Sequence, residues 1–105
     1  MKPIIVLCTT NNQDSAKSIA KSLVEENLCA CVNIIPNICS IYRWEDKIET
    51  DEEYLMLIKT GKHLIDKIKN RIIELHSYDV PEVVVLDISD GSKDYLDWIG
   101  NNIKF

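Results

Sequence analysis

The sequence has little glycine, no excess of basic charge and no long apolar run. Three of its 105 residues are glycine, and none belongs to a phosphate-binding loop, a nucleophile elbow or a helical metalloprotease motif. We therefore expect a protein that is not an enzyme. Acidic residues outnumber basic ones by 17 to 12, and the net charge of -5 disfavours nucleic acid as a partner. No apolar run reaches the roughly 20 residues that cross a bilayer, so we expect no membrane contact.

The sequence also lacks a leader of the secretory kind, and we expect a cytoplasmic protein. Its four cysteines are Cys8, Cys29, Cys31 and Cys39, an even number that is compatible with disulfides. However, 46% of the residues are hydrophobic, and three of the cysteines lie in apolar, strand-like runs. This pattern favours reduced thiols that pack as small core residues. Cys29 and Cys31 are expected on one face of a strand, where a metal or redox pair is the alternative to packing.

The length of 105 residues is that of one domain, 1–105, without an internal linker or a low-complexity segment. Apolar runs of strand length alternate with helical periodicities along the chain. We expect strands over 3–8, 30–44, 48–58 and 83–88, with a bulge or kink at 36–37 in the second. Helices are expected over 16–24, 64–75 and 92–99, the first capped by Asn11 or Asn12 and the last by Ser92.

This order predicts an α+β fold of the ferredoxin-like, split βαβ type. It has an antiparallel sheet with two helices on one face, a long hairpin between the second and third strands, and a short C-terminal helix. The strand order is 4-1-3-2, so the end of the first strand lies beside the start of the fourth. Right-handed crossovers bring the end of the second helix to the same rim. Cys8 and His76 thus meet there, within reach of a shared metal ion.

The long hairpin predicts self-association. Residues 31–44 extend for about 46 Å at roughly 3.3 Å per residue, whereas each long helix covers only about 22 Å. Part of the hairpin must therefore extend beyond its own domain, and it carries Ile41, Tyr42, Trp44 and Ile48. Exposed apolar edge strands favour pairing with another chain, so we expect a homo-oligomer.

At this point the chain resembles the CutA divalent-cation tolerance proteins over essentially its whole length. The matching stretches follow one another in order and at the right spacing. They are VLCTT at 6–10, LCACVNIIP at 28–36, SIYRWEDKI at 40–48, LIKT at 57–60, HSYDVPEV at 76–83 and YLDWI at 95–99.

The resemblance implies a homotrimer whose long hairpins reach across to neighbouring subunits, and a role in tolerance of divalent cations. It also implies a copper site at Cys8 and His76. In a bacterial relative the copper ligands are a cysteine and two adjacent histidines, and Leu75 stands here in place of the first histidine. Glu82 or a neighbouring chain would then have to supply a third ligand.

Three other interpretations stay open from the sequence. The first is a trimeric small-ligand sensor or interaction scaffold of the PII type, with a pocket between subunits at Thr9, Lys59, Tyr78 and Glu82. The second is a nucleophilic pair in which an imidazole activates the Cys8 thiol. In the third, the acids of the hairpin, residues 45–53, concentrate cations at the surface, although a solvated turn explains them equally simply.

Overall fold

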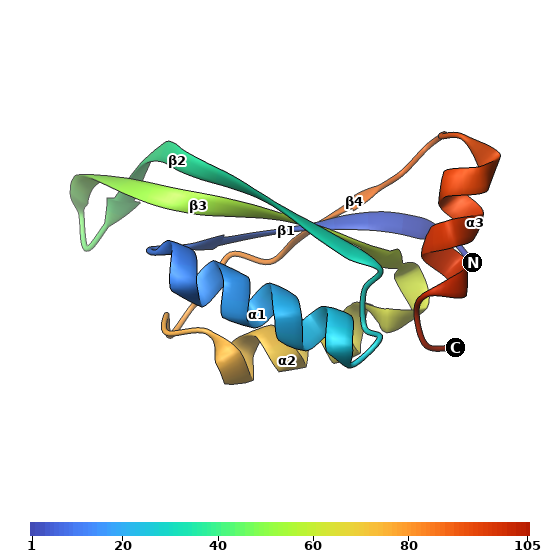
Figure 1. Ribbon diagram of the computed structural model, residues 1–105. Helices are drawn as coiled ribbons and strands as arrows, with labels where there is room; N and C mark the ends of the chain where they lie inside the picture. The colour runs from blue at the N-terminus through green and yellow to red at the C-terminus, as the bar shows by residue number, and fades with distance from the viewer.

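The computed structural model describes residues 1–105 as a four-stranded antiparallel sheet with three helices (Figure 1). The elements in chain order are β1 (Pro3–Thr10), α1 (Gln13–Glu25), β2 (Cys31–Trp44), β3 (Lys47–Gly61), a 3₁₀ turn (Lys62–Leu64), α2 (Ile65–Leu75), β4 (Val84–Asp87) and α3 (Lys93–Asn101). The sheet order is β2-β3-β1-β4. The predicted split βαβ fold and its strand order are therefore confirmed.

Helices α1 and α2 lie side by side on one face of the sheet, and α3 lies at the end of the sheet near both termini (Figure 1). Alternate residues of the strands point toward the two long helices. Ile4, Val6 and Ile58 from the sheet and Ile68 and Ile72 from α2 are all at most 1% exposed. Asn12 caps α1 as predicted, because its side chain accepts a 2.8 Å hydrogen bond from the Ser15 amide. The core thus lies between the helices and one face of the sheet.

An ion pair joins the two long helices at their outer surface. Arg71 of α2 donates from Nε and Nη2 to the carboxylate of Glu26, the C-cap residue of α1, at 2.9 Å each. A further bond links Nη1 of Arg71 to Glu74 at 3.0 Å. The two-pronged geometry holds the C-terminal end of α1 against the middle of α2.

The hairpin of β2 and β3 extends beyond the helices at one end of the molecule (Figure 1). Its register shifts between Ile35 and Ile38, which confirms the bulge predicted at Pro36 and Asn37. The two-residue turn has positive φ at both Glu45 (49°) and Asp46 (64°), the conformation of a tight hairpin turn. Large apolar side chains near the tip are left open: Ile41 is 69% exposed, Trp44 56% and Ile48 62%.

The sheet face that α1 and α2 leave uncovered carries apolar side chains on all four strands. Strand pairing places Leu86 beside Ile5, and it places Leu7 between Val84 and Leu57. Next to them Leu55 pairs with Ile35 on β2. We call these seven side chains the open face. Ile35, Val84 and Leu86 are each more than 40% exposed, and the other four are partly exposed. A surface of this kind favours contact with another chain.

The cysteines and the last strand differ in detail from expectation. All four cysteines are free thiols. Cys29 is buried but lies just before β2, which begins at Cys31, so the prediction of two thiols in one strand was wrong. Cys39 is exposed on the hairpin rather than packed in the core. None of the helices is both long and apolar enough to cross a membrane.

Candidate functional site

The structure brings Cys8 and His76 to the same backbone carbonyl. Cys8 lies near the end of β1 on the face covered by the helices, and His76 is the C-cap residue of α2. The carbonyl oxygen of Thr9 accepts a short bond from Nε2 of His76 at 2.6 Å and a weak one from Sγ of Cys8 at 3.9 Å. The rim at which the sequence predicted these residues to meet therefore exists.

Both ring nitrogens of His76 are used within the chain. A carbonyl oxygen can only accept, so Nε2 carries the proton that it donates to Thr9. Nδ1 accepts a 3.0 Å bond from the backbone N–H of Tyr78. The imidazole is thus a neutral ring that joins the end of β1 to the segment leading into β4. It has no free lone pair for a metal ion and none for a proton from Cys8.

The Cys8 thiol is a poor nucleophile. Cys8 is fully buried, and burial together with the carboxylates of Glu82 and Glu53 raises the pKa of its thiol from 9.0 to about 12. Activated thiols have the opposite property, a pKa lowered by nearby positive charge. The geometry therefore gives no support to the nucleophilic pair.

The same features bear on the predicted copper site. Copper and zinc bind thiolate and neutral imidazole, each through a lone pair, and a closed site needs three or four donors. No group of three His, Cys, Asp or Glu side chains in the chain is close enough to hold a metal ion. As the side chains lie here, Cys8 and His76 do not fit a resident metal. A copper ion at these two residues stays a prediction, and it requires His76 to give up one hydrogen bond.

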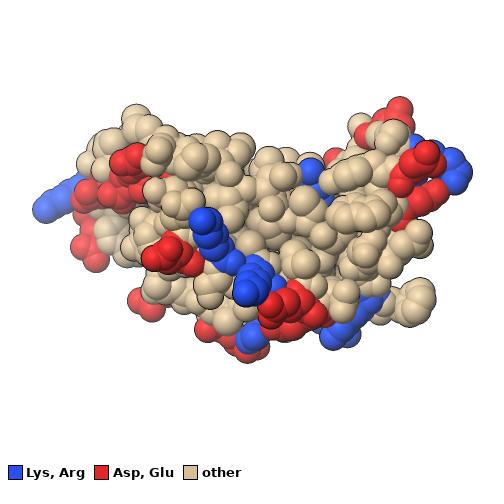
Figure 2. Space-filling model, viewed as in Figure 1, with Lys and Arg blue, Asp and Glu red and all other residues tan.

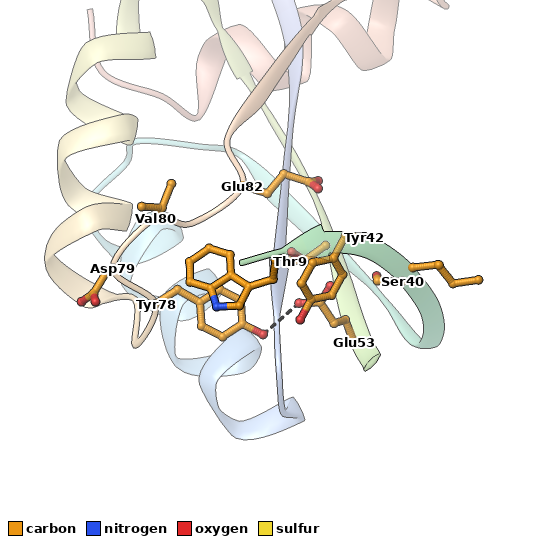
Figure 3. A pocket seen from close by; sticks show the side chains of 10 residues that line it. Thr9, Ser40, Tyr42, Glu53, Tyr78, Asp79, Val80 and Glu82 are labelled. Carbon is orange, nitrogen blue, oxygen red and sulfur yellow. Dashed lines mark hydrogen bonds between the residues drawn. The ribbon is translucent and has the colours of Figure 1, made fainter. Parts of the chain in front are cut away.

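Thr9 also lines a pocket, which opens between the hairpin and the segment that leads into β4 (Figure 3). Its volume is about 620 Å³. Thr9, Tyr78 and Glu82 all line it, as the sequence predicted for the rim. Lys59 does not. Thr9 pairs with Leu55, whereas Lys59 lies four residues further along β3, about 13 Å away, with its Nζ 3.2 Å from the Tyr95 hydroxyl of α3.

Aromatic rings and carboxylates dominate the pocket. The hairpin contributes Tyr42 and Trp44, and Tyr78 comes from the segment after α2. The Tyr78 hydroxyl donates a 2.8 Å bond to Glu53, which is 8% exposed although it is charged (Figure 3). Burial and this bond raise the pKa of Tyr78. Glu82 lies at the same pocket, and no lysine, arginine or histidine lines it.

Glu53 is the residue that sequence reasoning missed. It was grouped with the acids of the hairpin, which gather as a negatively charged region at that end of the molecule (Figure 2). Most of those acids are exposed, and Tyr42 donates a hydrogen bond to one of them, Asp51, which raises the pKa of Tyr42 to about 12. Strand alternation alone separates Glu53 from its exposed neighbour Glu52, because it turns Glu53 toward Thr9 and Tyr78.

Comparison with known proteins finds one family model and several relatives that match most of the chain. The family model described as "CutA1 divalent ion tolerance protein" matches residues 4–102. A Thermus thermophilus protein named "Divalent-cation tolerance protein CutA" is 49% identical over 93% of this chain and 95% of its own length. The chain spans 56% of an Arabidopsis thaliana relative, "Protein CutA, chloroplastic", with 44% identity.

Solved structures agree with the sequence comparison. The Thermus thermophilus divalent cation tolerance protein superposes with a TM-score of 0.95 at 47% identity, over 97% of this chain and 99% of that one. CutA1 from Oryza sativa gives a TM-score of 0.97 at 42% identity, over 99% and 95%. The fold is therefore shared with these two proteins over nearly the whole of each chain.

Proposed function

The chain belongs to the CutA1 divalent ion tolerance protein family, and on that premise we propose that it acts as a non-enzymatic homotrimer in the tolerance of divalent cations. The names of its relatives support the cation role. The open face and the hairpin tip support the assembly. The observation that carries the proposal is that the apolar side chains on these two surfaces have no cover within one chain.

Self-association gives these side chains a partner. The hairpin has Ile41, Trp44 and Ile48 near its tip, all more than half exposed, and the open face lies beside it on the same sheet. Each apolar side chain that is removed from water on assembly contributes about 1.5–3 kcal/mol when burial is complete. Three copies in a closed ring would cover both surfaces of every chain, as the family resemblance implies.

Copper binding is the finer part of the proposal. The predicted ligands are Cys8 and His76, and binding requires the buried thiol to lose its proton and His76 to release Thr9 or Tyr78. A titration with copper that compares the native protein with C8A and H76A tests the site, and C39A, which removes an exposed thiol, is the control. We expect weaker binding in C8A and H76A only. Equal affinity in all four proteins would eliminate these ligands.

The cation role is tested in cells. A bacterial strain that lacks its own family member would be grown at rising copper concentrations, with and without this chain. We expect the chain to restore growth, and I48E, which places a charge on the self-association surface, to restore less. If the native chain gives no growth advantage at any copper concentration, the proposed role is wrong. The same strain carrying C8A shows whether tolerance requires the Cys8 thiol. Growth restored by C8A as well as by the native chain would mean that tolerance does not depend on metal binding at this thiol.

The buried position of Cys8 supports the proposal that the chain does not catalyse a reaction through a thiol. At pH 7.5 a thiol with a pKa of about 12 is ionised about a thousandfold less than an ordinary exposed thiol. Alkylation of Cys8 by iodoacetamide should be slower than that of N-acetylcysteine by a comparable factor. Mass spectrometry of the Cys8 peptide measures the rate. A Cys8 that reacts faster than N-acetylcysteine would favour an enzyme.

We further propose a cytoplasmic location, supported by four free thiols. A fluorescent fusion that separates with the soluble cytoplasmic fraction would support it, and recovery from another compartment would contradict it.

A further inference from the structure

The pocket beneath the hairpin has a ligand chemistry that neither the family nor the cation role assigns. Its lining combines Tyr42, Trp44 and Tyr78 with the carboxylates of Glu53 and Glu82. The volume of about 620 Å³ is within the range of small-molecule sites. All of its lining residues belong to one chain, but Trp44 is also part of the hairpin surface that the proposed trimer covers, so the inference requires the pocket to stay open beside the neighbouring copy.

The charge of the pocket selects a cation. Every ionisable side chain of fixed charge that lines it is an acid, Glu53, Asp79 or Glu82, and none is basic. The exposed acids of the hairpin add to the negative potential at the same end of the molecule (Figure 2). An anionic ligand such as a nucleotide would meet repulsion without a single compensating base.

The aromatic rings select an organic cation over a metal ion. No three His, Cys, Asp or Glu side chains converge closely enough to ligate a metal. Tyrosine and tryptophan faces instead attract ammonium and guanidinium groups and pack against the methylene groups attached to them. A carboxylate that accepts hydrogen bonds from an ammonium group supplies the directional contact.

Two buried polar groups at the pocket mark it as a built site. Glu53 is only 8% exposed, and its sole hydrogen bond within the chain comes from Tyr78 to Oε2, which leaves Oε1 free to accept. Thr9 is 6% exposed; Cys8 and His76 bond to its backbone carbonyl oxygen, and its side-chain hydroxyl makes no hydrogen bond within the chain. Figure 3 shows Thr9, Glu53 and Tyr78 together at the pocket. No fully buried side-chain nitrogen or oxygen of the chain lacks a partner, so the free oxygen of Glu53 and the hydroxyl of Thr9 are still reachable by solvent. An ammonium group in the pocket can donate hydrogen bonds to both.

We propose that this pocket binds an organic ammonium ion of the aliphatic polyamine class. The ammonium groups contact the carboxylates of Glu53 and Glu82, and the methylene chain lies against the aromatic rings of the hairpin. An extended polyamine suits the pocket because the two acids come from different elements, β3 and the segment before β4.

The direct test is calorimetric titration of the assembled native protein with spermidine at 0.15 M salt, where long-range surface attraction is screened. We expect spermidine to bind the native protein saturably. The dissociation constant of E52Q should lie within about twofold of the native value, because Glu52 is exposed and turned to the other strand face. We expect binding to be about tenfold weaker, or more, in E53Q, which loses a charged acceptor. E82Q should weaken it as well, and Glu82 is exposed, so that variant is expected to fold. The neutral 1,8-octanediol should not bind.

A second readout places the ligand in the pocket. Trp44 lines the pocket whereas Trp98 lies on α3, so W98F leaves Trp44 as the single fluorescent tryptophan. Spermidine should change its emission with the affinity found by calorimetry.

Three results would overturn the proposal. The first is no saturable binding to the native protein, including the case in which only the dissociated I48E chain binds because a neighbouring copy fills the pocket. The second is equal weakening in E52Q and E53Q, which would mean nonspecific attraction to the hairpin. The third is binding of 1,8-octanediol as tight as that of spermidine.

Discussion

The two faces of the sheet are built by alternate residues of the same strands, yet they have different surroundings. On β1, Ile4, Val6 and Cys8 are at most 1% exposed beneath the helices, while Ile5 and Leu7 between them belong to the open face. The covered face holds the fold together. The open face and the hairpin that extends from it are available for contacts beyond the chain, and the acidic pocket lies at their border.

The largest expected effect on folding separates two neighbours on β3. I58A removes a fully buried side chain from the covered face and should lower the free energy of unfolding by about 2–5 kcal/mol at any protein concentration. L57A changes the open face and should act mainly through assembly, so its cost should depend on concentration. Urea unfolding over a hundredfold range of concentration measures both. Equal, concentration-independent losses would show that the two faces do not differ in this way.

Alkaline pH should act next most strongly, and on the covered side. Burial raises the pKa of both Cys8 and Cys29 from 9.0 to about 12. A raised folded-state pKa stabilises the protein fully below pH 9, and the contribution is lost as pH rises from 9 to 12. At pH 10.5 each thiol should cost about 2 kcal/mol. Urea unfolding between pH 9 and 12 gives the free energy of unfolding as a function of pH. This free energy should fall much less with pH in the double variant C8A/C29A than in the native protein. An equal fall in both proteins would exclude the two thiols as the cause.

His76 lies between the two regions, and its replacement should have a smaller effect. H76A removes the bonds to the Thr9 carbonyl and from the Tyr78 amide and should destabilise the chain by about 1–3 kcal/mol. The measurement is urea unfolding in the presence of a metal chelator. The loss should be the same with and without the chelator. A loss seen only when metal is present would instead assign His76 a purely metal-binding role.

The smallest effect is expected at the outer surface of the helices. R71M breaks the bonds to Glu26 and Glu74, whose side chains are 36% and 63% exposed. Because solvent screens such pairs, the loss should be less than that of H76A and should shrink further as salt rises. Urea unfolding in 0.05 M and 0.5 M sodium chloride measures this, and a loss that grew with salt would contradict a screened ion pair.

Much of the fold could be predicted because its signals are local. The apolar run that ends at Cys8, the cap at Asn12 and the long strand over 31–44 are all encoded within a few residues. The strand order followed from the tight hairpin turn and the handedness of crossovers.

The site was less predictable because its contacts join distant positions. Tyr78 buries Glu53 from 25 residues away, and the hydrogen bonds of His76 reach back to Thr9. Lys59 was predicted at the pocket because the register of β3 against β1 was unknown. Thr9 pairs with Leu55, and Lys59, four residues further along β3, lies beside α3 instead. Cys29 was assigned to a strand because an apolar run does not show where the strand pairing begins.

Native mass spectrometry at micromolar concentration tests the central claim that the open face and the hairpin serve contacts between chains. The account predicts three chains for the native protein, a single folded chain for I48E, and three chains for I73E. Ile48 on the hairpin and Ile73 on the outside of α2 are 62% and 57% exposed, so they differ in location far more than in exposure. The claim would be contradicted if the native protein were detected as a single chain, or if the I73E variant dissociated as readily as I48E.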